Sequence, residues 1–256
     1  MRVYHLLIGL LLLALSPLIF KSVFSKPKIE EKTKPVKVTE TQSTINLVQT
    51  SPNTANNPVN SGTTNIWKNL LGKTSSPNNW KTLPCQGSSA TLCVTSQGKN
   101  IGTVEMTTYT LSQQPNFPKM LLTAGIDPNS PAEYTNIDYQ NKVSAALGIW
   151  IAQYYATILN DRQTTVQNPN VTFSVYPPQK VAFGKLQGIR YGFAEIKNEG
   201  GVLEQHFGYI AFDGKAIYNI TTAFDPNAIT GKFAQLENMA VFEPYLSATI
   251  ADLKLP

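Results

Sequence analysis

Hydrophobic and polar positions divide the chain into three parts. Residues 6–20 form an apolar run, LLIGLLLLALSPLIF. Residues 26–64 are rich in Lys, Thr, Pro, Ser, Asn and Gln, so this stretch cannot bury enough apolar surface to offset its ordering entropy. Apolar residues return near Ile66 with the spacing of strands and helices. We therefore expect a signal peptide or membrane anchor over 1–25, a disordered linker over 26–64 and one globular domain over 65–256.

The N-terminal segment has the layout of an export signal, because Arg2 precedes the apolar run and Lys21 follows it. The run is about fifteen residues long, whereas a helix needs roughly twenty to cross a bilayer. Two alternatives stay open: cleavage near Ser25, or retention as a hydrophobic N-terminal helix that tethers the domain to the membrane. No Cys stands close after the run, which excludes a lipid-modified N-terminus.

The first half of the expected domain predicts two strands and a long helix. Alternating positions indicate strands over 91–95 and 101–111. Apolar residues at three- and four-residue steps indicate an amphipathic helix over 139–160. Ser130 and Glu133 have the spacing of a capping box, which predicts a helix start there. The helical positions are Val143, Leu147, Trp150, Ile151, Tyr154 and Ile158.

The second half predicts a run of strands and a closing helix. Asp213-Gly214 predicts a two-residue type I′ hairpin, and Asp225-Pro226 is expected to end the last strand. The closing helical region is expected to be interrupted near Pro244. This order predicts an α+β fold, an antiparallel sheet covered by helices on both faces. The five strand candidates are 171–178, 180–188, 189–197, 202–212 and 215–224.

The two cysteines, Cys85 and Cys93, are eight positions apart and bracket a Gly/Ser-rich stretch. In an exported chain two nearby cysteines are expected to form a disulfide. A redox-active pair would favour C-x-x-C spacing or a lowered thiol pKa, and the sequence supplies neither.

The chain has a formal net charge of +5, but the charge is uneven. Residues 1–64 hold seven basic and three acidic residues, which leaves the rest of the chain with a net charge of +1. No basic stripe with interleaved aromatic residues occurs, so we expect no nucleic-acid partner. The lysines after the apolar run are expected to solvate the linker.

Side chains that could carry catalysis are few, with two His and two Cys in the chain. His206 is the one His of the expected domain, and Glu204 shares its strand face because residues two apart point the same way. Such a pair could serve general acid–base chemistry. Because no Gly-flanked Ser nucleophile or phosphate-binding loop accompanies it, we expect no enzyme activity, no cofactor and no metal site.

The pattern G-I-R-Y-G-F, followed by a longer strand and by Y-I-A-F-D-G-K-A-I-Y-N-I-T, spans much of residues 171–255 together with the final helix. It resembles the C-terminal half of PsbP-like proteins, whose α/β/α sandwich is shared with a eukaryotic Ran-release factor and some bacterial envelope proteins. The resemblance implies a non-catalytic adaptor, often exported, and in cyanobacteria and chloroplasts often placed in the thylakoid lumen near photosystems. The linker and the Cys85/Cys93 loop depart from the family pattern.

Two functions follow as hypotheses. The first is a membrane-tethered extracytoplasmic adaptor, in the periplasm or thylakoid lumen, that binds or helps assemble a membrane protein complex. The second is a small-molecule or lipid-binding module whose sheet and helices enclose an apolar cavity. Candidate residues for that cavity are Tyr109, Trp150, Tyr154 and Tyr155.

Overall fold

An eight-stranded sheet organises the chain in the computed structural model, which describes residues 64–74, 76, 79–88, 90–165 and 170–255. The expected leader, and all of the expected linker except Thr64, lie outside these residues. The strand order is β1-β2-β3-β8-β7-β6-β5-β4, and β3 also pairs with β7. The β7–β8 pair is parallel and the other pairs are antiparallel. The strands are β1 (Lys81–Pro84), β2 (Thr91–Ser96), β3 (Lys99–Thr110), β4 (Val171–Phe183), β5 (Leu186–Lys197), β6 (Val202–Phe212), β7 (Ala216–Phe224) and β8 (Lys232–Phe233).

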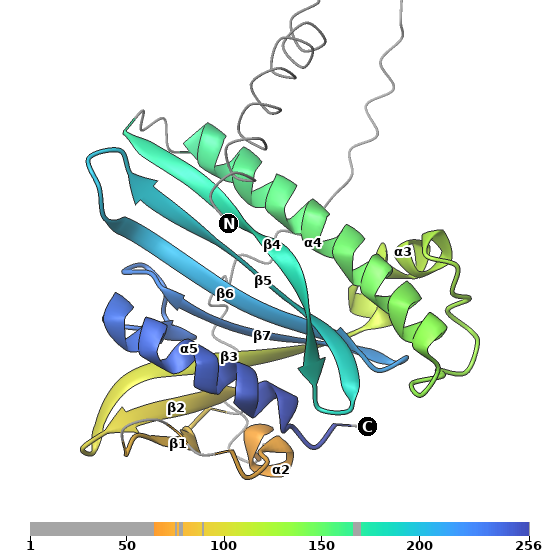
Figure 1. The fold of residues 1–256 in the computed structure, drawn as a ribbon, viewed down its shortest axis with the longest axis horizontal. Coiled ribbons are helices and arrows are strands. Elements are labelled where there is room, and N and C mark those ends of the chain that lie inside the picture. Colours follow the sequence, from red (N-terminus) through yellow and green to blue (C-terminus); the bar gives the residue numbers. More distant parts are fainter. Residues whose placement is uncertain (1–63, 75, 77–78, 89, 166–169, 256) are drawn as a thin grey trace, which may run out of the picture. The chain divides into compact units, whose positions relative to one another are not determined.

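Helices cover both faces of this sheet, as the sequence predicted (Figure 1). On one face lie α3 (Phe117–Thr123) and α4 (Ile137–Thr165), whose buried side chains form a core with Tyr191 of β5. On the other face α5 (Leu236–Ala251) and the short α2 (Trp67–Leu70) form a second core with β2, β3, β6 and β7. Two hydrophobic cores on opposite faces of one sheet confirm the predicted α/β/α sandwich.

The predicted strand candidates 171–178 and 180–188 are wrong in their boundaries. Residues 171–183 form one strand, β4, and its register with β5 shifts between Tyr176 and Gln179. Pro177 and Pro178 therefore cause an irregularity, not a strand end, because β4 is an edge strand where a missing N–H is tolerated. The chain turns later, at Gly184, which has a positive φ of 57°.

The turn of the predicted hairpin at Asp213-Gly214 is longer than the expected two residues. Phe212 pairs with Ile217, so Asp213 to Lys215 connect β6 to β7. The Asp213 carboxylate accepts hydrogen bonds from the backbone N–H groups of Lys215 and Ala216, at 2.8 and 2.7 Å. These bonds stabilise the longer turn.

The long helix extends beyond the predicted range 139–160 at both ends, and no helix starts at Ser130. Helix α4 starts at Ile137, where the Asn136 side chain accepts a hydrogen bond from the N–H of Asp138 at 2.9 Å. The predicted start at Ser130 and Glu133 is wrong, because Asn136 supplies the cap that the first turn needs. The helix runs to Thr165, past the predicted end at residue 160, so Arg162 lies in its last turn.

Helix α5 is continuous through Pro244, contrary to the predicted interruption. A proline removes one helical hydrogen bond, but the apolar side of α5 is buried against the sheet on both sides of this position, through Phe242 and Leu246. The short elements α2, β1 and α3 were not predicted. No helix in the part of the chain that the structure describes is both long and apolar enough to span a membrane.

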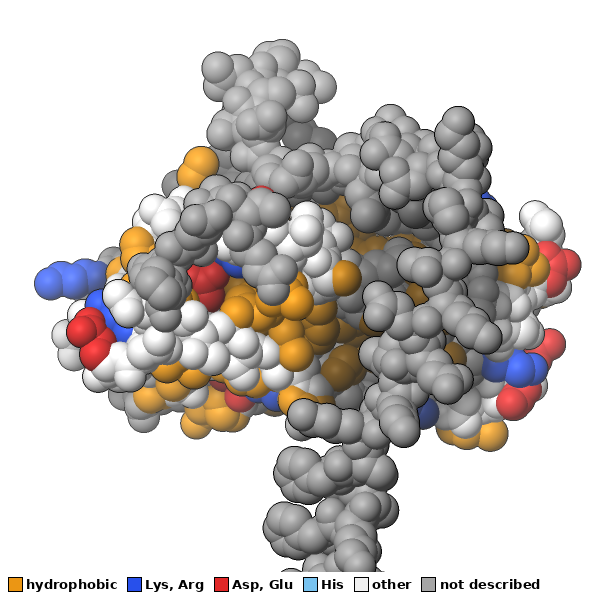
Figure 2. Space-filling model, turned by 90° about the horizontal axis from the view of Figure 1, so that it is seen from above, with side chains coloured by type: hydrophobic (Ala, Val, Ile, Leu, Met, Phe, Trp, Pro, Cys, Tyr) orange, Lys and Arg blue, Asp and Glu red, His pale blue; other side chains and the backbone are white. Residues whose placement is uncertain are grey.

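Figure 2 shows one face of the domain, with hydrophobic side chains visible between charged ones that lie mainly toward its ends. The exposed large hydrophobic residues come from several elements of the fold. Val175 of β4 and Val241 of α5 are each 42% exposed.

Candidate functional site

His206 lies at the centre of a group of charged side chains at one end of the sheet. Its Nε2 atom is 3.3 Å from Glu204 Oε2 and 3.7 Å from Asp225 Oδ2. Glu204 and His206 occupy one face of β6, as alternation predicted. Asp225 follows β7 directly, next to the paired residues Gln205 and Phe224. Two neighbouring strands therefore bring two carboxylates to one imidazole.

Arg162 joins this group from the last turn of α4. Its Nη2 atom donates a hydrogen bond to Glu204 Oε1 at 2.7 Å. Its Nε atom lies 2.9 Å from Glu195 Oε1, an ion pair without hydrogen-bond geometry. The arginine thus fixes one oxygen of Glu204 and leaves the other oxygen facing His206. We call Arg162, Glu195, Glu204, His206 and Asp225 the His206 cluster.

Further contacts hold the side chains of His206 and Asp225 in place. The His206 ring stacks on Phe193 with a centroid distance of 4.3 Å and an interplanar angle of 13°. Asp225 Oδ1 accepts a hydrogen bond from the N–H of Asn227 at 2.7 Å. The side chains of Glu204, Asp225 and His206 are 8%, 13% and 26% exposed. The cluster is therefore mostly buried, and the imidazole is the most exposed of these three side chains; the Arg162 side chain is 32% exposed.

The surroundings shift the pKa values of the two glutamates in opposite directions. Burial alone would raise the pKa of Glu204, but the hydrogen bonds and charges of His206 and Arg162 outweigh it and lower that pKa. Burial raises the pKa of Glu195, and the negative charge of Glu204 raises it further. Glu204 is therefore held in its ionised form at neutral pH.

Two kinds of chemistry are open to this arrangement. A carboxylate beside an imidazole can exchange a proton. The ligand atoms of Glu204, His206 and Asp225 also lie within 4.8 Å of one another, close enough to bind one metal ion. Sequence reasoning paired Glu204 with His206 and missed Arg162, Glu195 and Asp225, because these residues come from distant segments.

The four aromatic residues proposed for a ligand cavity belong to one group around Tyr191, which is buried. The rings of Trp150, Tyr154 and Tyr155 lie 6.1, 5.5 and 6.4 Å from the Tyr191 ring, centroid to centroid. Tyr191 donates a hydrogen bond to Asn219 Oδ1 at 2.8 Å. Burial raises the pKa of Tyr154 to about 12. These side chains pack on one another and on the core.

Two hollows lie away from this aromatic group, near the start of α4. One, between Tyr134, Tyr139 and Phe212, has a volume of about 10 Å³, which is about the space that one water needs. The other is an open depression of about 340 Å³ beside the β4–β5 turn, lined in part by Lys180 and Lys185. Neither contains Tyr109, Trp150, Tyr154 or Tyr155.

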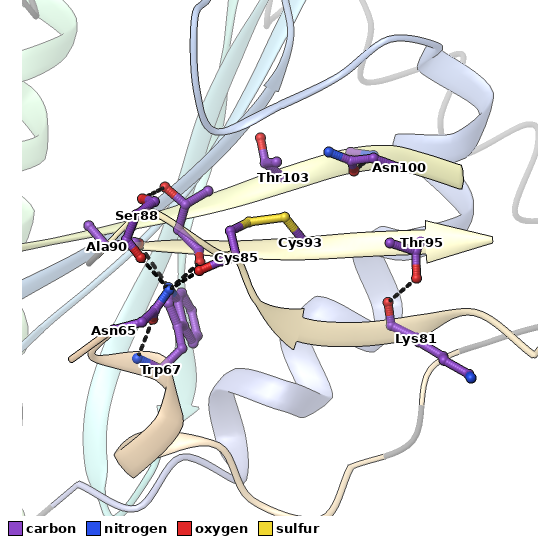
Figure 3. Close-up of a disulfide and its surroundings, with 12 residues drawn as sticks. Asn65, Trp67, Lys81, Cys85, Ser88, Ala90, Cys93, Thr95, Asn100 and Thr103 are labelled. Carbon is purple, nitrogen blue, oxygen red and sulfur yellow. Dashed lines mark hydrogen bonds between the residues drawn. A yellow bond between two sulfur atoms is a disulfide. The ribbon is translucent and has the colours of Figure 1, made fainter. Parts of the chain in front are cut away.

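Cys85 and Cys93 form the predicted disulfide (Figure 3). It joins the residue after β1 to β2, and a hydrogen-bonded corner surrounds it. Asn65 Nδ2 donates to Thr91 O at 2.9 Å and also lies 2.6 Å from Ser88 O. The indole N–H of Trp67, which is fully buried, donates to Ala90 O at 2.8 Å. The disulfide therefore closes a loop whose backbone is also held by Asn65, which precedes α2, and by Trp67, the first residue of α2.

Comparisons with known proteins find similarity among solved structures. No family model matches the chain, and no curated protein matches it. Among solved structures, the chain is similar to the solution structure of cyanobacterial PsbP (CyanoP) from Synechocystis sp. PCC 6803, with 8% sequence identity and a TM-score of 0.35. The match covers 75% of this chain and 90% of that chain. Residues 171–255 resemble PsbP-like proteins in sequence, but a structural match at 8% identity and a TM-score of 0.35 does not assign the chain to that family.

Proposed function

We propose that this chain is an extracytoplasmic protein without catalytic activity, tethered to a membrane by its N-terminal segment. Its globular domain binds a protein partner in a membrane complex or assists the assembly of that complex. The apolar run over 6–20 supports export. The Cys85–Cys93 disulfide supports an oxidising compartment, because cytosolic thiols are kept reduced.

The observation that carries partner binding is the free edge of the sheet at β4. Within the described part of the chain, this strand of 13 residues pairs only with β5. The outer backbone groups of an edge strand are a template on which another chain can add a strand. Pro177 and Pro178 interrupt the middle of β4 and leave residues 171–176 as the longest regular edge. Val175 is exposed within that stretch.

The kind of complex is proposed from the sequence resemblance alone. Residues 171–255 resemble PsbP-like proteins, and that resemblance implies a photosystem-associated complex in the thylakoid lumen if the host is photosynthetic. In another host the corresponding place is the periplasm, with a different membrane complex as partner.

Site-specific photocrosslinking in intact membranes tests the proposal. A photoreactive amino acid is placed at Val175 of β4, and in a matched control at Val241 of α5, which has the same side chain and the same 42% exposure. We expect a defined protein adduct from position 175 and none from position 241. An adduct from 241 alone would contradict the β4 edge as the binding surface. Recovery of the uncrosslinked protein alone, from both positions and from gently solubilised membranes, would contradict partner binding.

A further inference from the structure

We propose that Glu204, His206 and Asp225 bind one divalent transition-metal ion of the zinc type. This inference goes beyond partner binding and does not depend on it. Its basis is the position of three ligand atoms, Glu204 Oε2, His206 Nε2 and Asp225 Oδ2, which converge at one end of β6 and β7.

The Glu204–His206 contact is a long hydrogen bond, and the separations of the three ligand atoms also suit a shared ion. Glu204 Oε2 is 3.3 Å from His206 Nε2, and Asp225 Oδ2 is 3.7 Å from it, whereas charge-assisted N–H···O bonds are about 2.7–2.9 Å long. Two tetrahedral ligands with bonds of about 2.0–2.1 Å to zinc lie about 3.3–3.4 Å apart. The pair Glu204 and His206 is thus already spaced as two ligands of one ion. Asp225 Oδ2 is a few tenths of an ångström farther from His206 Nε2 than that spacing, and all three ligand atoms lie within 4.8 Å of one another.

Supporting contacts orient each ligand and leave the proposed ligand atom facing the others. Arg162 binds the other oxygen of Glu204, and the N–H of Asn227 binds the other oxygen of Asp225. The His206 ring is held flat against Phe193. Metal sites in proteins show this arrangement, in which outer contacts fix the orientation of the ligands.

The charges of the cluster also match a divalent cation. Glu195, Glu204 and Asp225 carry three negative charges against one positive charge on Arg162, so the cluster has a net charge of −2 when the imidazole is neutral. A neutral imidazole is the form that coordinates a metal. An imidazole among the ligands favours zinc and its neighbours over magnesium and calcium, which prefer oxygen ligands. The 26% exposure of the His206 side chain leaves a route for the ion and a position for water.

Matched residues outside the His206 cluster provide control substitutions. It contains the tripeptide Asp-Pro-Asn twice, at 127–129 and 225–227. In both copies the Asp accepts a hydrogen bond from the N–H two residues later. Asp225→Asn and Asp127→Asn therefore remove the same charge from the same type of turn, but only the first lies in the cluster. The chain has one other histidine, His5, so His5→Gln controls for His206→Gln.

The experiment titrates the full chain, purified in detergent, with ZnCl₂ by calorimetry and follows the ¹⁵N-labelled imidazole signals by NMR. We expect one ion per chain and a shift of the signal that His206→Gln removes. Asp225→Asn and Glu204→Gln should weaken binding at least about tenfold, whereas Asp127→Asn and His5→Gln should leave it within twofold. Circular dichroism shows whether each variant is folded. If His206→Gln does not fold, the Zn²⁺-dependent shift of the imidazole signals in the unmodified chain is the test of the proposal.

Three results would overturn the proposal. One is the absence of binding to Zn²⁺, Co²⁺ and Mn²⁺ at millimolar concentration. Another is Zn²⁺ binding that persists unchanged in Asp225→Asn and Glu204→Gln. The third is a Zn²⁺-dependent shift of the His5 signal without one of the His206 signal. None of these results bears on partner binding at β4.

Discussion

The hydroxyl of Tyr155 donates a hydrogen bond to the backbone carbonyl of Tyr176 at 2.9 Å. The same hydroxyl accepts a hydrogen bond from the N–H of Gly192, also at 2.9 Å. Tyr176 and Gly192 are the last paired residues before the register of β4 and β5 shifts at Pro177 and Pro178. A side chain of α4 thus bridges the two strands where the ladder is interrupted.

Replacing Tyr155 by Phe should destabilise the domain by about 1–2 kcal/mol, because it leaves two backbone groups in a half-buried position without this partner. Urea unfolding measures the change in the free energy of unfolding. Tyr245→Phe is the control, since Tyr245 lies on α5 and is 37% exposed, and it should change stability by less than about 0.5 kcal/mol. Equal unfolding midpoints for both variants would show that the bridge contributes nothing.

The disulfide should contribute to stability through the unfolded state. Cys85 and Cys93 are separated by 8 positions, and closing so short a loop is worth roughly 2.5 kcal/mol in the chain-entropy model. The double variant Cys85→Ser/Cys93→Ser should melt at a lower temperature than the oxidised protein by several degrees. Adding dithiothreitol should lower the melting temperature of the unmodified protein and leave that of the double variant unchanged. An unmodified protein that is insensitive to full reduction would contradict this prediction.

Much of the fold was predictable because its signals are local. In the strand predicted over 189–197, alternation places Ile189 and Tyr191 on one face, and both lie in the core under α4. The spacing of the two cysteines likewise predicted the disulfide that the structure contains. Periodicity and short spacing act within a few residues, so one sequence is enough to read them.

The cluster was harder to predict because it depends on the length of one turn. A two-residue turn at Asp213-Gly214 would pair Phe212 with Lys215. Asp225 would then lie two positions away from Glu204 in the register of β6 and β7. The longer turn pairs Phe212 with Ile217 and Gln205 with Phe224, which brings Asp225 beside Glu204. Arg162 was missed for another reason: α4 continues past the expected end, and only its packing on the sheet brings Arg162 to Glu195 and Glu204.

Acid should weaken a contact between the two ends of the domain. The Asp252 carboxylate accepts hydrogen bonds from the Thr74 hydroxyl and from the N–H groups of Lys73 and Thr74. The Thr74 side chain, followed by the Lys73 N–H, lowers the pKa of Asp252 below its ordinary value. Because the pKa is lower in the folded state, this contribution to stability is present above about pH 4 and is lost as pH falls through the folded-state pKa.

Asp252→Asn should therefore lower the free energy of unfolding most near neutral pH. The difference in unfolding free energy between this variant and the unmodified protein should become smaller below pH 4. Urea unfolding across this range measures it. Thr74→Val removes the hydroxyl that binds Asp252, so its free energy of unfolding should depend less on pH in this range than that of the unmodified protein. Thr74→Ser keeps the hydroxyl and should retain the pH dependence. A gap between Asp252→Asn and the unmodified protein that stays constant with pH would exclude this role for the carboxylate.

Gly208 of β6 makes room for the ring at the centre of the aromatic group. A Cβ atom at this position would lie 2.2 Å from Cζ of Tyr191, a ring that is buried and hydrogen-bonded to Asn219. Because that ring cannot swing into solvent, Gly208→Ala should destabilise the domain by about 1–3 kcal/mol. Gly148→Ala is the matched control, since Gly148 lies inside α4 with no atom within 4 Å of its would-be Cβ, and it should stabilise the domain by up to about 1 kcal/mol. The two changes add the same methyl group and should move the urea midpoint in opposite directions. If both variants shift the urea midpoint in the same direction, the Tyr191 ring has more space around it than this structure shows.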